Sequence, residues 1–245
     1  MEYDKLPIMQ DFWYGFKTQV PHTENWKGDK LLQPFGPTVF ITSITEEFNH
    51  SLLTEADRLT KKDNDFNFSL AGNLKKGRSY KYSDEYIKSC EPYLKSKIED
   101  YLSLFIESWG NKGVKQTLED SSEKGYIQKK IYLDSLWINF QKQHDFNPTH
   151  NHSGVFSFVI YNKVPKEIFD TQADSNHQKA GCLLFEYGES ITPMMSTCFT
   201  VTPYEGLMII FPAKLKHSVP PFWVDKERIS VSGNFILGDF KEKTT

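Results

Sequence analysis

From about residue 129 onward, the sequence consists of short β-like segments, each bounded by clusters of Gly, Pro, Asn or Asp. The segment 131–143 alternates, with Trp137, Asn139 and Gln141 on one side and apolar residues on the other. Similar segments follow at 153–164, 182–187, 195–202, 207–211 and 229–237. Strands of this kind after a helical region predict an α+β fold, in which helices cover a β sandwich or jelly roll.

The amino-terminal half is predicted to be mainly helical. Residues 37–43 are β-branched and predict a first strand, whereas apolar residues at helical spacing predict a helix over 44–62. A longer helix is predicted from Ser83 to Trp109, with Ser83 or Asp84 as its cap. The polar regions 63–81 and 165–180 are predicted to be surface loops that could act as lids over a site.

Length and composition limit the classes of protein that are possible. A chain of 245 residues fits one domain, which we divide into a flank with the helices and first strand (1–128) and a β core (129–240). The net charge of -3 gives no strong indication of nucleic-acid binding. Three cysteines without metal-type spacing favour reduced thiols. Neither a signal peptide nor a membrane-spanning run is present in the sequence, so we expect a cytoplasmic location and no membrane partner.

Three histidines are candidate metal ligands. His150 and His152 are two residues apart, so on an extended chain both side chains point to the same side, as two ligands of one ion require. His217 follows the apolar segment 207–211 and a turn at Pro212. Each histidine could equally be an ordinary surface or loop residue, and the residues that follow His217 bear on this choice.

Arg228 begins a strand whose polar residues share one face. Ser230, Ser232 and Asn234 lie on the same side as Arg228, and Ile229 and its apolar neighbours lie on the other. This polar face could be exposed to solvent. It could instead line a pocket, in which the guanidinium binds a carboxylate through two parallel hydrogen bonds and Ser230 adds a third.

Together these motifs resemble the 2-oxoglutarate/Fe(II) dioxygenase superfamily, and more closely an oxygenase subgroup of bacteria and tailed phages that is related to prolyl hydroxylases. The resemblance covers roughly residues 130–238, and it implies a double-stranded β-helix (jelly-roll) core with amino-terminal flanking helices. The motifs that carry it are Trp137-Ile-Asn139, Asn147-Pro-Thr-His-Asn-His152, Phe211-Pro212, His217 and Arg228-Ile-Ser-Val-Ser-Gly-Asn-Phe235.

The resemblance implies an enzyme that uses Fe(II), 2-oxoglutarate and O2 to hydroxylate a C–H bond. The substrate would be a small molecule or a peptide, with a prolyl or other peptidyl side chain favoured, and neither the substrate nor the oligomeric state follows from the sequence. The implied metal ligands are His150, His152 and His217; the cosubstrate residues are Arg228, Ser230, Tyr161 and Asn139; the substrate residues are Gln141, Asn234 and Trp137.

One departure from the superfamily pattern is His152, because a carboxylate usually occupies that position. Either the three histidines bind the metal, or one of the paired histidines lies outside the ligand set and Asp145 or Glu186 completes it. Two rival interpretations are a cupin-type metalloprotein and a metal-free, ligand-binding jelly roll. The cupin lacks support, because the glutamate expected four or five residues after His152 is absent.

Overall fold

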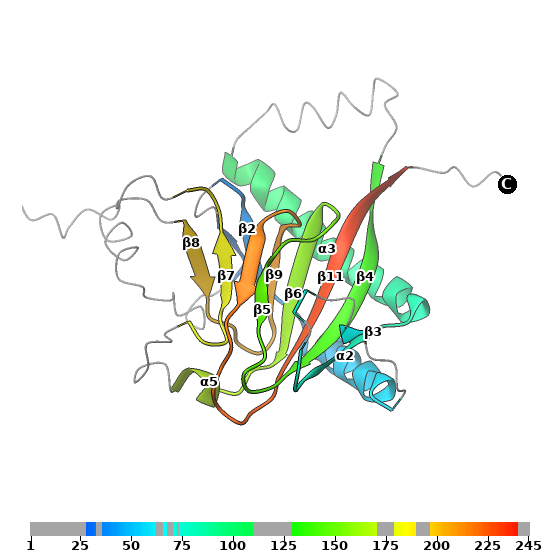
Figure 1. Cartoon of the computed structure of the whole chain (residues 1–245). Coiled ribbons are helices and arrows are strands. Elements are labelled where there is room, and N and C mark those ends of the chain that lie inside the picture. Colours follow the sequence, from blue (N-terminus) through cyan, green and yellow to red (C-terminus); the bar gives the residue numbers. More distant parts are fainter. Residues whose placement is uncertain are drawn as a thin grey trace, which may run out of the picture.

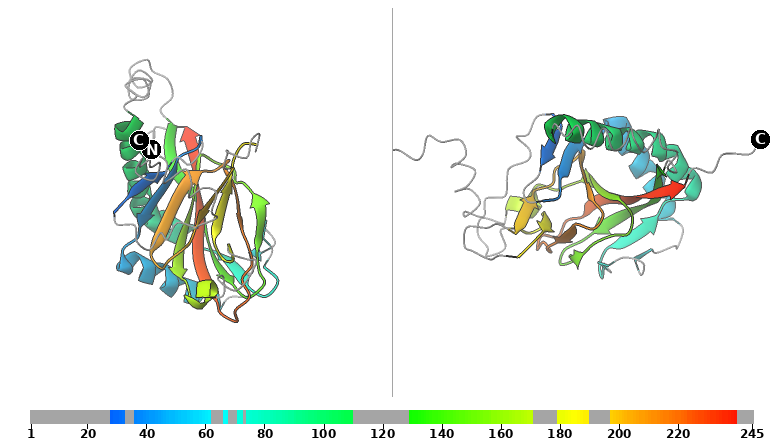
Figure 2. Two further views of the ribbon diagram at one scale, coloured as in Figure 1. Left: turned by 90° about the vertical axis from the view of Figure 1, so that its left-hand side faces the viewer. Right: turned by 90° about the horizontal axis from the view of Figure 1, so that it is seen from above.

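The computed structural model describes residues 28–32, 36–61, 66–67, 71–72, 74–109, 129–170, 179–189 and 197–239. Its strands form two antiparallel sheets that face each other, and two helices lie on the outer face of the larger sheet (Figures 1 and 2). This arrangement confirms the predicted α+β fold with a jelly-roll core and flanking helices in the amino-terminal half.

The larger sheet has seven strands and the smaller has four. In spatial order the larger contains β1 (Lys30–Leu32), β2 (Val39–Ser43), β9 (Leu207–Pro212), β6 (Phe156–Lys163), β11 (Arg228–Asp239), β4 (Lys129–Gln141) and β3 (Arg78–Lys81). The smaller contains β5 (Asn147–His150), β10 (Lys216–Val219), β7 (Leu183–Glu186) and β8 (Cys198–Val201). The early strands β1, β2 and β3 thus complete the edges of a sheet whose centre comes from the carboxy-terminal half.

Two long helices, α2 (Glu46–Leu59) and α3 (Asp84–Trp109), cover the larger sheet. Thr45 caps α2 by accepting a hydrogen bond from the Phe48 amide, and Ser83 accepts one from the Tyr86 amide at the start of α3, as predicted. The buried side chains of both helices form one apolar cluster with residues of the sheet, including Leu52, Leu94, Ile98, Ile138, Phe158 and Ile210.

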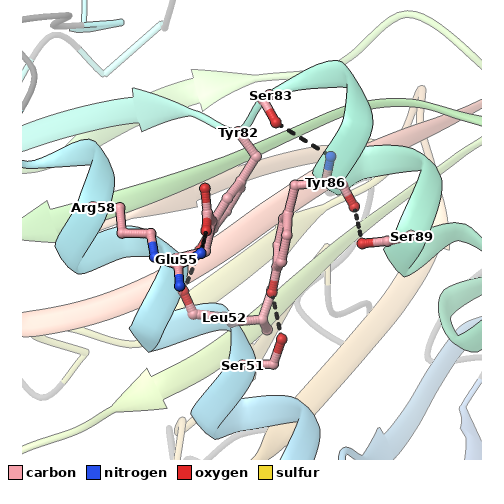
Figure 3. Close-up of polar contacts among 8 residues, drawn as sticks. All are labelled: Ser51, Leu52, Glu55, Arg58, Tyr82, Ser83, Tyr86 and Ser89. Atoms are coloured by element: carbon pink, nitrogen blue, oxygen red, sulfur yellow. Dashed lines mark hydrogen bonds and ion pairs between the residues drawn. The ribbon is translucent and has the colours of Figure 1, made fainter.

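Polar contacts also tie the two helices to each other (Figure 3). The buried Tyr82 hydroxyl donates to the Leu52 carbonyl at 3.0 Å, and the hydroxyls of Ser51 and Tyr86 lie 2.8 Å apart. Burial raises the pKa of Tyr82 well above its ordinary value, so the hydroxyl keeps the proton that it donates. The helical layer is therefore fixed relative to the sheet before any ligand is considered.

The space between the sheets is apolar at one end and polar at the other. Along β9, Leu207, Ile209 and Phe211 point between the sheets, whereas Met208 and Ile210 point toward the helices. The first set packs on β7 and β8 through buried Leu183, Phe185 and Val201. This packing holds the sheets apart and positions the candidate site in the remaining part of the gap.

The sequence patterns did not predict every element. The strand β3 lies within the predicted loop 63–81, and the short helix α5 (Glu167–Asp170) lies within the predicted loop 165–180. The strands β1, β5 and β10 were also not predicted, because they are short and owe their order to pairing with neighbours. No described helix is long and apolar enough to cross a membrane.

Candidate metal centre

Three histidines converge at the polar end of the gap between the sheets. His150 on β5 lies directly opposite His217 on β10, and His152 follows two residues after His150. One potential ligand atom from each of these three residues lies within 4.8 Å of the others. The backbone amide of His152 donates to the Ala213 carbonyl at 2.8 Å, which fixes the backbone at His152. The three imidazoles could therefore hold one metal ion.

Backbone carbonyls fix how two of these rings face the cluster. The Nδ1 atom of His150 lies 2.7 Å from the Pro148 carbonyl, and Nδ1 of His217 lies 3.0 Å from the Leu215 carbonyl. Because a carbonyl oxygen can only accept, each Nδ1 must carry the proton. The lone pair is then left on Nε2, which is the form of imidazole that binds a metal.

Burial keeps the rings of His217 and His152 neutral. The pKa of His217 falls to about 3, mainly because burial penalises the charged form and also because His150 lies nearby. The pKa of His152 falls to about 4 for the same two reasons. Both imidazoles are therefore unprotonated at neutral pH and available as ligands.

The larger sheet contributes a floor of polar side chains in register. Ser230 on β11 lies between Asn139 on β4 and Tyr161 on β6, and Arg228 lies opposite Gln141. The register thus places two rows of polar groups on the face that meets the histidines. The resulting inter-sheet pocket is lined by Ala71, Gly72, Leu74, Trp137, Asn139, Gln141, Asn147, His150, His152, Phe158, Val159, Tyr161, Leu183, Phe211, His217, Val219, Arg228, Ser230 and Ser232.

Arg228 is a buried cation at this floor, with 2% of its surface exposed. Its terminal nitrogens donate to the Gly181 carbonyl and to Oε1 of Gln141, and its guanidinium carbon lies 5.4 Å from the centre of the Tyr161 ring. Its Nε has no hydrogen-bond partner, and no described carboxylate forms an ion pair with it. Burial lowers its pKa, and the groups that oppose this effect, Tyr161 and Cys182, are weak acids and not carboxylates. A buried guanidinium in this state fits an anionic ligand.

The neighbours of Arg228 also present hydrogen-bond donors to the pocket. Ser79 donates to Oδ1 of Asn139 at 2.8 Å, so the amide of Asn139 turns its Nδ2 donors elsewhere, and no described residue accepts from them. Burial raises the pKa of Tyr161 to about 12 despite the opposing charge of Arg228, so this phenol stays protonated. Together with the Ser230 hydroxyl, these groups suit a carboxylate.

The two carboxylates considered as alternative metal ligands lie outside the cluster. Asp145 accepts hydrogen bonds from the backbone amides of Lys76, Gly77 and Lys142 at 2.7–3.0 Å. Glu186 lies opposite Lys216, one position away from the Phe185–His217 pair, and Thr149 donates to it at 3.4 Å. Among the described residues, the cluster that could hold a metal contains the three histidines and no acid.

Most of the side chains predicted from the sequence meet in this pocket, and one does not. Asn234 shares the strand face of Arg228 but lies beyond the lining, where it accepts from Ser157 at 2.7 Å and donates to Ser135 at 3.2 Å. Its amide therefore serves the packing between strands. The other residues predicted to bind substrate, Gln141 and Trp137, do line the pocket, and the Gln141 amide is already shared between Arg228 and the Asp145 carbonyl.

Sequence reasoning missed the wall formed by Ala71, Gly72 and Leu74, although it did suggest that the polar region around them could act as a lid. Asn67 pairs with the backbone of Leu74 through two hydrogen bonds, and Asp145 accepts a hydrogen bond from the backbone amide of Lys76. A Cβ on Gly72 would lie 1.5 Å from the Asn147 side chain, so this glycine allows the segment to approach β5 closely. Gly72 was the feature of the sequence that could have indicated this close approach, but the residue that it approaches, Asn147, is far away in the sequence.

Comparisons with known proteins agree with this geometry. Residues 135–234 match the family described as "Putative 2OG-Fe(II) oxygenase". No match was found among curated proteins.

Similar solved structures include three prolyl hydroxylases. A prolyl-4-hydroxylase of Pseudomonas putida is 16% identical, covers 80% of this chain and 90% of its own, and has a TM-score of 0.48. The collagen prolyl hydroxylase of Paramecium Bursaria Chlorella virus-1, in a 2OG complex, is 13% identical over 85% of this chain and 96% of its own (TM-score 0.39). A Trichoplax adhaerens prolyl hydroxylase, in complex with a hypoxia inducible factor peptide, is 12% identical over 95% of this chain and 92% of its own (TM-score 0.46).

The matched segment contains the strands and turns that carry all three histidines and Arg228. Residues 135–234 are therefore similar to a family whose description names 2-oxoglutarate and Fe(II). The donor set fits both components: the clustered imidazoles suit a divalent transition metal, and the unpaired guanidinium suits a carboxylate.

The role of Asp145 can be tested with Asp145→Asn. The amide would place an N–H group against backbone N–H donors, so we expect the free energy of unfolding to fall by about 1–3 kcal/mol in urea denaturation. Metal affinity of the folded variant should stay unchanged. Glu186→Gln, at a partly exposed position, serves as the control and should change stability by less than about 0.5 kcal/mol. Weaker metal binding in either folded variant would return that carboxylate to the ligand set.

The buried His217 predicts how the metal-free protein responds to acid. Below the ordinary pKa of 6.5, the unfolded chain binds a proton on His217, whereas the folded chain does not until about pH 3, so stability is lost as the pH falls through this range. At about pH 5 this residue should lower the free energy of unfolding by about 2 kcal/mol relative to its value at neutral pH. Urea unfolding at both pH values should show a smaller loss for His217→Gln, and an equal loss would contradict the neutral, buried assignment.

Proposed function

We propose that this protein is a dioxygenase that hydroxylates a C–H bond of its substrate with Fe(II), 2-oxoglutarate and O2. The observation that carries this proposal is the buried, unpaired guanidinium of Arg228 in the same pocket as three clustered imidazoles. A metal cluster alone is compatible with a cupin, and a polar pocket alone is compatible with a binding module. A buried cation without a counter-ion next to a metal cluster favours a cosubstrate with a carboxylate remote from its metal-binding end.

The proposed metal ligands are the imidazoles of His150, His152 and His217. His150 and His217 would bind through Nε2, because their Nδ1 atoms already donate to backbone carbonyls. The iron, when bound, supplies the redox chemistry that activates O2. The protein contributes the rigid pairing of β5 with β10, which presents the ligands without rearrangement.

The proposed cosubstrate subsite lies on the larger sheet. Arg228 would bind the distal carboxylate of 2-oxoglutarate, with the Ser230 hydroxyl, the Tyr161 phenol and the Asn139 amide as further donors. Gln141 holds the guanidinium through Oε1 and is itself held by the Asp145 carbonyl through Nε2. This chain of contacts fixes the direction of the cation before the ligand arrives, which reduces the entropy lost on binding.

The proposed reaction consumes one molecule each of substrate, O2 and 2-oxoglutarate. One oxygen atom is inserted into a C–H bond to give the alcohol, and the other enters the carboxylate of succinate, while CO2 leaves. The pocket walls suit this chemistry, because Trp137, Phe211 and Leu183 place apolar surface beside the histidines. Tyr161, whose pKa burial raises to about 12, keeps its proton, so its role, like that of the Arg228 guanidinium, is to bind and orient.

The substrate would enter beside the wall formed by Ala71, Gly72 and Leu74. These small or apolar residues, together with the Asn147 side chain, define the part of the pocket that neither the metal nor the cosubstrate needs. We propose a small molecule or a peptide as substrate, with a prolyl or other peptidyl side chain favoured by the sequence resemblance. Trp137 and Gln141 are the proposed contacts on the opposite side.

The first test of this function is metal binding. Anaerobic Fe(II) with 2-oxoglutarate should give a weak visible charge-transfer band, and His217→Ala should abolish it because one of three ligands is lost. Lys216→Ala, an exposed neighbour on the same strand, is the control and should keep the band. A band that survives in His217→Ala would remove this residue from the ligand set, and metal binding without 2-oxoglutarate binding would support the cupin.

The second test concerns the cosubstrate. Arg228→Ala should weaken 2-oxoglutarate binding to the metal-loaded protein by about 1.5–3 kcal/mol, the usual worth of a charge-assisted contact. Arg228→Lys keeps the charge but loses the two-pronged geometry, so it should restore only part of the affinity. Calorimetry measures both values, with Lys216→Ala as a control for the loss of a positive charge outside the pocket. Unchanged affinity of Arg228→Ala for 2-oxoglutarate would show that Arg228 does not bind the cosubstrate.

A further inference from the structure

The pocket carries an unusual balance of charge. Among its described lining residues there is one cation, Arg228, and no aspartate, glutamate or lysine. The histidines must be neutral to bind a metal, so they add no charge to the site. The protein therefore brings a single positive charge and nothing to offset the charge of a divalent ion.

The acids nearest to the histidines in sequence and register are committed elsewhere. Asp145 is 4% exposed, and its two oxygens accept three backbone amide hydrogen bonds. Glu186 alternates with Phe185 on β7, and Phe185 is the residue that packs toward His217. The side chain of Glu186 thus leaves on the opposite face of the smaller sheet.

The loaded site would consequently keep one positive charge. A divalent metal and Arg228 together contribute three positive charges, and the dianion of 2-oxoglutarate removes two. An iron site with two histidines and one carboxylate would end neutral under the same count. A net charge in a partly buried pocket is costly, and the cost falls when a counter-charge enters with the next ligand.

We propose that the site, once loaded with metal and 2-oxoglutarate, binds a monoanionic group beside the metal. This inference rests on the proposed function and defines the substrate class: a substrate that presents a carboxylate near the bond to be hydroxylated. A small inorganic anion such as chloride shares the same chemistry, and the experiment below separates the two sources. The wall of Ala71, Gly72 and Leu74 places no charge against such a group.

The test uses the Fe(II) protein saturated with 2-oxoglutarate under anaerobic conditions. Acetate, chloride and the neutral isostere acetamide are titrated in turn at constant ionic strength, with calorimetry and the position of the charge-transfer band as readouts. We expect acetate to bind about tenfold or more tightly than acetamide, because attraction to a net positive charge is strong at low effective dielectric. Binding of acetate points to the substrate as the source of the anion, whereas binding of chloride alone points to a solution anion.

A matched pair of substitutions isolates the charge at position 152. His152→Asp restores the missing negative charge, and His152→Asn has nearly the same shape without it. The aspartate variant should lose the preference for acetate over acetamide, whereas the asparagine variant should keep it. If either variant fails to bind metal, the comparison of acetate with acetamide in the native protein decides alone.

The outcomes of this experiment separate the two hypotheses. Failure of 2-oxoglutarate to bind the metal-loaded protein would overturn the proposed function. Normal binding of 2-oxoglutarate, followed by equal affinity for acetate and acetamide, would overturn the anionic substrate alone. A preference for acetate that persists unchanged in metal-binding His152→Asp would also overturn it, because the missing carboxylate would then not be the cause.

Discussion

The arrangement of the site depends on a buried guanidinium without a counter-ion. Arg228 is held by a carbonyl and an amide oxygen, both neutral, and its Nε has no partner. A cation in this environment is tolerated because the Tyr161 ring beside it is polarisable and because the Gln141 side chain that holds it is itself held by the Asp145 carbonyl. Removing a charge from water costs several kcal/mol, so such a residue is expected where an anion restores the balance. The anionic cosubstrate of the family meets this condition.

Strand register turns this single residue into a subsite. Because β11 lies between β4 and β6, each inward position of β11 has an inward neighbour on both sides. Ser230 is flanked in this way by Asn139 and Tyr161, and a slip of β11 by one residue would turn Ser230 toward the helices. The apolar residues that alternate with them, Ile138 and Val231, are buried under the helices and prevent that shift. Packing on one face of the sheet thus specifies chemistry on the other.

The sequence predicted the parts of this arrangement that depend on local patterns. Alternation identified β4 and β11, and with them the face that Asn139 shares with Gln141 and the face that Arg228 shares with Ser230. It could not identify β5 and β10, because their residues (Asn-Pro-Thr-His and Lys-His-Ser-Val) have little strand preference, and their order comes from pairing with β7 and with each other. Asn234 was predicted at the site because it continues the pattern, but the register shift after it and its bonds to Ser157 and Ser135 place it outside. Lys76 and Gly77, which follow the wall of Ala71, Gly72 and Leu74, are held by hydrogen bonds to Asp145, nearly seventy residues away, and no local pattern contains these bonds.

The two halves of the site come from different sheets, and this explains why the gap between the sheets must be rigid. His150 and His217 belong to the smaller sheet and Arg228 to the larger one. A cosubstrate bound to both must therefore bridge the sheets, and its length sets the separation that the fold has to maintain. Phe211, Phe185 and Leu183 provide this spacing at the apolar end, where the rings of Phe211 and Phe185 meet edge to face with their centroids 4.9 Å apart, and both approach the His217 ring. The aromatic cluster that packs against His217 thus helps to set its distance from Arg228, and the proposed cosubstrate would bridge these two residues.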